Sequence, residues 1–141
     1  PILKKEKIDL IFSSDLLRCK ESAKIIADGL NLKIKFNKRL REYNFGLFNG
    51  KSKKKWFDFL AKINRFKECP PKGENWTDIK NRIKSFLNDI ESQYRDKKIL
   101  IVSHQDVLLN FEAVAENLSN KNLLKNRNRL RIKTGEFKRI T

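Results

Sequence analysis

His104 is the only histidine in the chain, and it stands just after an apolar stretch, ILIV, at 99–102. The stretch reads as a buried strand, and Ser103 connects it to the histidine. An imidazole changes charge near neutral pH, so it can bind an anion as a cation or exchange a proton. A histidine that merely satisfies its ring nitrogens at a sheet edge is the alternative. Its position favours a functional role, because α/β proteins bind ligands at the carboxyl ends of their strands.

Two other side chains suit phosphate chemistry. Arg18, in SSDLLRCK, lies near the start of the helix expected after the first strand. Its planar guanidinium can bind two phosphate oxygens at once, although a plain surface arginine is the alternative. Glu42 lies in the irregular segment RLREYNFGLFNG. Near a phosphate its carboxyl group would be driven towards the protonated form and could act as a general acid, whereas an ordinary loop glutamate is solvated. Glu74 is the next carboxylate to consider for that role.

The elements that must position these residues alternate between strands and helices. Strands are predicted at 8–14, 32–36 and 98–103, helices at 16–29, 54–66, 76–94 and 107–118, and a closing hairpin at 129–133 and 136–140. This order predicts an α/β fold in three layers, with a largely parallel sheet flanked by helices. No internal repeat or linker interrupts it, so residues 1–141 are predicted to form one domain.

The helix at 16–29 carries specific expectations about its ends and its buried face. Asp15 is a plausible N-cap and Gly29 a plausible C-terminal stop. The residues expected to share a face are Leu17, Ser22, Ile25 and Ile26.

The net charge of +16, from 33 basic and 17 acidic residues, attracts anions of any kind. A bias towards lysine, asparagine and isoleucine could also produce this charge with no partner involved. The chain has no apolar run long enough for a membrane span, and its charged start does not resemble a signal peptide. Cys19 and Cys69 form no CxxC pair, which favours a reduced, cytosolic protein with no metal site.

Other phosphate-binding machinery is absent from the sequence. There is no GxxxxGK[ST] motif, so a nucleotide P-loop is excluded. Six residues after the two cysteines stand Ile25 and Asn75, where a cysteine phosphatase would need an arginine.

Four segments, taken in order, resemble the histidine phosphatase superfamily, whose members are phosphoglycerate mutase-like. They are SSDLLRCKESA, RLREYNFGLFNG, GENWTDIKNRIKSFL and ILIVSHQDV, and the resemblance runs from about Ile8 to the C-terminus. It implies a cofactor-free enzyme in which a histidine of an Arg-His-Gly motif attacks phosphorus and becomes phosphohistidine. Arginines and a second histidine hold the phosphoryl oxygens, a glutamate protonates the leaving oxygen, and water hydrolyses the intermediate.

By this resemblance Arg18 matches the clamp arginine, Glu42 the proton donor and His104 the second histidine. The Arg-His-Gly motif has no counterpart, because the chain has no other histidine. The resemblance therefore implies a nucleophile, together with the first strand of the sheet, upstream of Pro1. The chain is then N-terminally incomplete and expected to be inactive alone. Gln105-Asp106 stands where family members often carry glycines.

The segment between Gly46 and Gly73 is short, which resembles small metabolite phosphatases such as alpha-ribazole phosphatase more than the glycolytic mutases. The expected partner is a phosphorylated small molecule, without a membrane, and a homodimer is compatible with the family. The alternatives are a mutase-type phosphotransferase, a pseudo-phosphatase that has lost its nucleophile, and a basic nucleic-acid-binding module. KSKKK at 51–55, followed by Trp56 and Phe57, could grip RNA, although helix-spaced aromatic residues are more often core.

Overall fold

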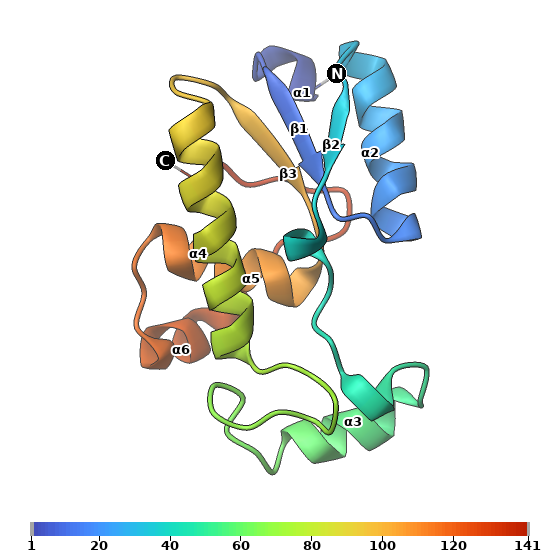
Figure 1. The fold of residues 1–141 in the computed structure, drawn as a ribbon, viewed down its shortest axis with the longest axis vertical. Coiled ribbons are helices and arrows are strands. Elements are labelled where there is room, and N and C mark those ends of the chain that lie inside the picture. Colours follow the sequence, from blue (N-terminus) through green and yellow to red (C-terminus); the bar gives the residue numbers. More distant parts are fainter. Residues whose placement is uncertain (1, 141) are drawn as a thin grey trace. The chain divides into compact units, whose positions relative to one another are not determined.

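The computed structural model describes residues 2–140, which cluster into two compact units (Figure 1). The first unit takes in the chain up to Glu42 together with Ser85–Val107, and the second takes in Tyr43–Lys84 and the chain from Leu108 onwards. The prediction that residues 1–141 form one domain stays a prediction.

The first unit contains a three-stranded parallel sheet. Its strands are β1 (Leu10–Ser13), β2 (Ile34–Phe36) and β3 (Ile99–Val102), in the order β2-β1-β3. In the register, Ile11 of β1 lies opposite Ile34 on one side and Leu100 on the other. The three predicted strands and the parallel α/β sheet are therefore confirmed, and β1 is the middle strand of the part described.

Helices pack on both faces of this sheet. Helix α2 (Leu17–Leu30) contacts all three strands, and Figure 1 shows it beside them. From β1, the ring of Phe12 lies 5.3 Å from that of Phe86, in the C-terminal half of helix α4 (Trp76–Gln93), and 5.9 Å from that of Tyr94. Successive side chains of a strand point to opposite faces, so Phe12 serves the α4 face. This arrangement gives the predicted three layers within the first unit.

The buried face of α2 differs from the prediction. Leu17 is 71% exposed and Ile25 76%, whereas the buried side chains of the helix are Cys19, Ala23 and Ala27. These three residues repeat every four positions and so share one face. Small side chains let a helix backbone approach a sheet closely. The face of α2 that packs on the sheet is therefore the one with the small residues, and not the one with the most hydrophobic residues.

The ends of α2 also differ from the prediction. Leu16, not Asp15, is the N-cap residue, and no side chain caps it. The helix does not stop at Gly29 but continues to Leu30. The residue that ends it is Asn31, which adopts the left-handed conformation (φ 55°). Its backbone N–H donates to the carbonyl oxygens of Ala27 and Asp28.

The second unit is helical. It contains α3 (Lys53–Leu60), the N-terminal half of α4, the end of α5 (Gln105–Ala115) and α6 (Asn120–Leu130). The helix predicted at 54–66 is therefore shorter than expected. The large apolar side chains buried in this unit are Tyr43, Leu60, Phe66, Trp76, Ile79, Ile83, Leu109, Phe111, Leu123 and Leu130. Short helices occur in both units: α1 (Ile2–Lys5) and the 3₁₀ turn η1 (Lys38–Leu40) belong to the first, and the 3₁₀ turn η2 (Gly46–Phe48) belongs to the second.

The predicted C-terminal hairpin is wrong. Residues up to Leu130 form α6, whose N-cap is Ser119, with its Oγ accepting from the Asn122 N–H at 3.2 Å. A turn does form around Gly135 (φ +82°), but the residues on either side pair with no strand in the part described. Ion pairing holds this segment instead, because Lys138 contacts the buried carboxylate of Glu112.

Two loop segments of the second unit, 44–47 and 70–74, form what we call the clasp. The Leu47 N–H donates to the Pro71 carbonyl oxygen at 2.9 Å, and the Glu74 N–H donates to the Asn44 carbonyl oxygen at 3.0 Å. Gly46 sits in the middle at φ +57°, and a Cβ there would lie 2.0 Å from the Pro71 oxygen. The clasp therefore requires glycine at this position for both conformation and space.

Of the helices within residues 2–140, none is long and apolar enough to cross a membrane.

Candidate functional site

The carboxyl end of the first unit's sheet carries a cluster of polar side chains. Ser14 follows β1 and His104 follows β3, and both are buried. The backbone holds them together, since the Ser14 N–H donates to the Val102 carbonyl oxygen at 2.9 Å. The predicted meeting of the two strand ends is therefore seen in the structure.

Arg18 and Glu42 join His104 at this end of the sheet. The Nε of Arg18 donates to Nδ1 of His104 at 3.1 Å. The Glu42 Oε2 atom lies 3.8 Å from Nδ1 of His104 and 3.8 Å from Nη2 of Arg18. The Arg18 side chain is 63% exposed, whereas the His104 ring is buried. All three side chains singled out from the sequence thus lie in one cluster within the first unit.

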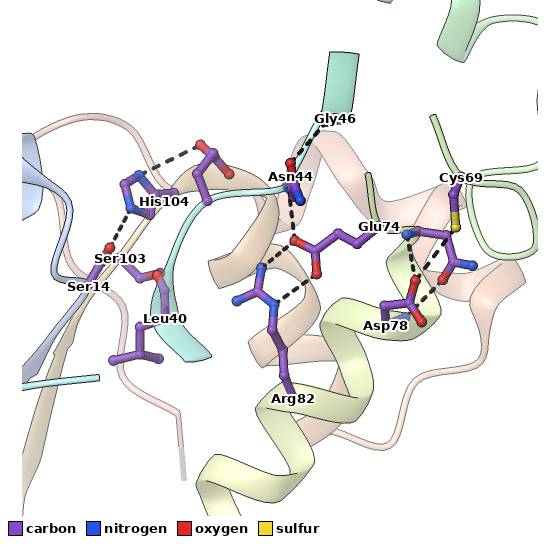
Figure 2. A network of polar contacts seen from close by, with 12 residues as sticks. Ser14, Leu40, Asn44, Gly46, Cys69, Glu74, Asp78, Arg82, Ser103 and His104 are labelled. Atoms are coloured by element: carbon purple, nitrogen blue, oxygen red, sulfur yellow. Dashed lines mark hydrogen bonds and ion pairs between the residues drawn. The ribbon is translucent and has the colours of Figure 1, made fainter. Parts of the chain in front are cut away.

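Backbone contacts of the segment at 37–42 bring Glu42 to the cluster. The Asn37 N–H donates to the Ser13 carbonyl oxygen at 2.9 Å, which continues the sheet edge. The Asn37 side chain then caps the 3₁₀ turn η1, and the buried Leu40 anchors the turn. Ser103 Oγ donates to the Leu40 carbonyl oxygen at 2.8 Å (Figure 2). The end of β3 therefore fixes the position of the loop that carries Glu42.

An ion pair next to Glu42 makes a second attachment. Arg41 donates from Nε to Asp15 Oδ1 and from Nη2 to Oδ2, both at 2.6 Å. The hydrogen bonds from Arg41 lower the pKa of Asp15 below its usual value, and Asp15 in turn raises the pKa of Arg41. Asp15 was predicted to cap α2. Asp15 instead holds the loop that carries Glu42, through its ion pair with Arg41, 26 residues further along the chain.

The inner side of the His104 ring faces Ser14 and Cys19. Nε2 lies 2.9 Å from Ser14 Oγ and 3.4 Å from Cys19 Sγ, and Figure 2 shows the serine and the ring pointing towards each other. The Cys19 thiol donates to the Ser103 carbonyl oxygen at 3.5 Å, and burial raises the pKa of this thiol. Sequence reasoning missed the place of Cys19. The repeat of small residues at 19, 23 and 27 was the available signal.

Chemically, this cluster offers donors for an oxyanion and an acid beside them. A guanidinium and an imidazole can both hydrogen-bond phosphoryl oxygens, and a carboxyl group 3.8 Å away can exchange a proton. Helix α5 begins at Gln105, directly after His104, so its first N–H groups also lie at this end. Among residues 2–140, no group of three or more histidine, cysteine, aspartate or glutamate side chains is placed to hold a metal ion.

Glu74, the second candidate acid, is used in the clasp. Its carboxylate accepts from Arg82 Nε at 3.1 Å and Nη2 at 2.9 Å, and from the Asn44 N–H at 2.9 Å (Figure 2). Both oxygens are therefore engaged in holding the loop segments of the second unit. This bonding favours Glu42 over Glu74 as the acid.

Sequence comparison finds relatives of this chain among curated proteins. The chain is 32% identical over 112 residues to a Hydrogenobacter thermophilus protein whose name contains phosphoserine phosphatase, a match covering 74% of this chain and 54% of the relative. It is 29% identical over 109 residues, 72% of this chain and 50% of the relative, to a Yersinia pestis protein whose name contains phosphoglycerate mutase. The chain thus spans about half the length of these curated relatives.

A likeness in structure accompanies the likeness in sequence. The structure of the alpha-ribazole phosphatase from Shigella flexneri superimposes with a TM-score of 0.73 at 22% identity, over 92% of this chain and 65% of that one, which shows a shared fold. The family model described as "Histidine phosphatase superfamily (branch 1)" matches residues 1–134. The chain belongs to the histidine phosphatase superfamily, branch 1.

Proposed function

We propose that the protein carrying this chain hydrolyses phosphomonoesters of small cytoplasmic metabolites through a phosphohistidine intermediate. The observation that carries the proposal is the cluster of Arg18, His104 and Glu42 at the carboxyl end of a parallel sheet, within 3.8 Å of one another. Ligands of α/β sheets bind at this end, and the cluster provides two phosphate-binding groups and one acid.

Each residue has a distinct role in the proposed reaction. Arg18 and His104 hold the phosphoryl oxygens, and Glu42 gives its proton to the leaving oxygen as the ester bond breaks. The nucleophile is a second histidine, and since the chain has only His104, it is expected upstream of Pro1. Water then attacks phosphorus, the phosphorus–nitrogen bond breaks, and Glu42 regains a proton. No cofactor takes part, and the 141 residues alone bind phosphate without turnover.

A mutase is the second candidate, because the name of one relative contains phosphoglycerate mutase. The same phosphohistidine can pass its phosphoryl group to a second hydroxyl in place of water. Product analysis separates the two: a phosphatase releases inorganic phosphate, whereas a mutase moves the phosphate within a molecule and releases little.

Phosphate binding to the 141-residue chain tests the roles of Arg18 and His104. A net charge of +16 attracts phosphate to any part of the surface, so titrations are run at 0.15 M salt, where exposed charges are screened. Arg18→Ala and His104→Ala should each weaken binding about tenfold or more, the usual loss when a hydrogen bond to a charged group is removed. The matched control is Arg95→Ala, which removes the same charge from an exposed residue outside the cluster. Equal losses in all three variants would contradict the site.

Activity is tested on the product of the longer reading frame. Addition of the coding sequence that precedes Pro1 should give turnover of p-nitrophenyl phosphate and an acid-labile phosphohistidine on the protein. An upstream segment without histidine, or a stop codon followed directly by an alternative start, would instead support the pseudo-phosphatase alternative.

A further inference from the structure

The contacts of the His104 ring identify where its proton lies. Nδ1 is 3.1 Å from Nε of Arg18, and Nε2 is 2.9 Å from Oγ of Ser14. The guanidinium Nε–H can only donate, so Nδ1 must be the acceptor and carries no hydrogen. The ring is therefore neutral in this arrangement, with its single proton on Nε2 and directed at Ser14.

Ser14 is well placed to receive that proton, because its own position is fixed from several sides. The residue is fully buried, and its Oγ also accepts from the Leu16 N–H at 3.3 Å, at the start of α2. The Cys19 thiol, which also borders the ring, donates to the Ser103 carbonyl oxygen at 3.5 Å. Ser14 Oγ is therefore placed to accept from both the ring and the backbone, while the neighbouring thiol is directed at a backbone oxygen.

We propose that Ser14 is the positioning residue of His104: it holds the proton on Nε2 and so directs the bare Nδ1 towards Arg18 and Glu42. This inference rests on the proposed function only in what Nδ1 faces: where a phosphoryl oxygen replaces the Arg18 contact, Nδ1 takes up a proton from solvent and donates to that oxygen, while the Nε2 proton stays directed at Ser14. Ser14 itself touches no substrate. It acts through the ring, as the outer partners of a metal-bound or catalytic histidine do.

The single histidine makes the test direct. In the 141-residue chain with ¹⁵N-labelled histidine, one ring gives two nitrogen signals, and their shifts identify which nitrogen is protonated. A ring N–H gives a sharp ¹H–¹⁵N cross-peak only when burial and hydrogen bonding slow its exchange with water. The wild type should show one such cross-peak, on Nε2, and an unprotonated Nδ1.

Three variants separate Ser14 from its neighbours. Ser14→Ala should abolish the protected Nε2–H cross-peak, because the Cys19 sulfur, 3.4 Å from Nε2, is a weak acceptor and does not replace the hydroxyl. Arg18→Ala should keep it. Ser13→Ala is the matched control and should also keep it, since Ser13 is equally buried but its hydroxyl donates to a backbone oxygen, that of Ser14. A wild-type proton on Nδ1, or a protected cross-peak that survives in Ser14→Ala, would overturn the inference.

A phosphate titration of the same samples distinguishes this inference from the proposed function. Phosphate should move the Nδ1 signal of the wild type, and Ser14→Ala should raise the phosphate dissociation constant about tenfold while Ser13→Ala leaves it unchanged. If the tautomer is as stated and phosphate moves nothing, the positioning role stands and the proposed function fails. If phosphate binds and the proton of the phosphate-free ring is on Nδ1, the proposed function stands and the positioning role fails.

Discussion

Arg41 and Asp15 form a two-point ion pair, with two hydrogen bonds of 2.6 Å between the guanidinium and the carboxylate. Arg41 precedes Glu42, and Asp15 lies directly before the N-cap residue of α2, the helix that carries Arg18. The pair thus ties the loop of the proposed acid to the helix of the proposed clamp. A fork geometry of this kind fixes orientation as well as distance.

The contribution of this ion pair to the free energy of unfolding should depend on pH. The pKa of Asp15 is lowered in the folded chain, so its contribution to stability is fully present above the unfolded value, near the usual 3.8. That contribution should be lost as the pH falls through the lower, folded pKa. Urea unfolding of wild type and Asp15→Asn should therefore differ at pH 6 and converge as the pH falls towards 3. A difference that grows on acidification would contradict this reading.

Arg41→Lys tests the geometry of the pair. Lysine keeps the charge and loses the planar fork, so the loop at Glu42 should become more mobile while the net charge is unchanged. Hydrogen exchange of the Leu40 and Glu42 amides is the measurement. Lys38→Arg, on the same 3₁₀ turn, is the control and should leave both rates as they are.

Glu42→Gln should affect substrates according to their leaving groups, in the longer protein that supplies a nucleophile. Alkyl phosphates need a proton on the leaving oxygen, whereas p-nitrophenolate leaves without one. The ratio of kcat/KM for p-nitrophenyl phosphate to that for an alkyl monoester should therefore rise by about 10²–10⁴ in the variant. An unchanged ratio would pass the acid role to another carboxylate, and Glu74→Gln is the comparison to run.

Gly46→Ala should disrupt the clasp. The new Cβ would lie 2.0 Å from the Pro71 carbonyl oxygen, on a backbone at φ +57°, so either the loop moves or the residue does not fit. We expect a loss of more than about 3 kcal/mol in the free energy of unfolding, measured by urea titration. Gly50→Ala is the control: φ is +74° there too, but open space surrounds the Cβ, so only about 1 kcal/mol of backbone strain is expected. Equal losses of stability in the two variants would show that the positive φ angle, and not the space around the new Cβ, sets the cost of the substitution.

Lys138→Met should destabilise the chain by about 3 kcal/mol, because it leaves the buried carboxylate of Glu112 without its cation. Glu112→Gln in the same background should restore part of this loss, since an amide carries no charge to neutralise. Lys133→Met removes an exposed charge nearby in sequence and should change stability by less than about 0.5 kcal/mol. No recovery in the double variant would show that the pair contributes through packing alone.

The two thiols should react at very different rates. Cys69 is exposed, whereas Cys19 is buried beside His104; the pKa of both thiols is raised by desolvation, so access makes the difference. A chromogenic disulfide at pH 8 should therefore modify one thiol quickly and the second only after denaturant is added, since thiolate and access are both required. Cys69→Ser should remove the fast phase. A fast phase that persists in that variant would show that the site opens readily.

The positions of Arg18 and His104 could be predicted because two general features set them, whereas Glu42, in an irregular loop, was matched to the acid only through the family resemblance. Parallel strands end at a common edge, and the apolar runs at 10–13 and 99–102 identified which strands those were. The predictions that failed depended on distant contacts. Asp15 had the residue type of a helix cap, but a two-point ion pair with Arg41 stabilises it more than one backbone N–H would.

The buried face of α2 failed for a related reason. Leu17 and Ile25 are the larger apolar side chains, yet Ala23 and Ala27 face the interior, because the distance between helix and sheet sets the size of side chain that fits. The final hairpin failed because strand propensity is realised only when a partner strand is available. For 131–133 and 136–140, the part of the chain that the structure describes supplies none.

The clasp also bears on how such a protein can diversify. It brings together two backbone segments about 25 residues apart and pins both ends of the stretch between them. The entropy of closing a loop grows only with the logarithm of its length, about 0.6 kcal/mol for each doubling. Loop closure therefore sets only a small cost on changing the length of the stretch at 48–69, provided that its buried side chains, Leu60 and Phe66, are kept. A change in the length of this stretch is therefore expected to cost less stability than a change in the clasp that closes it.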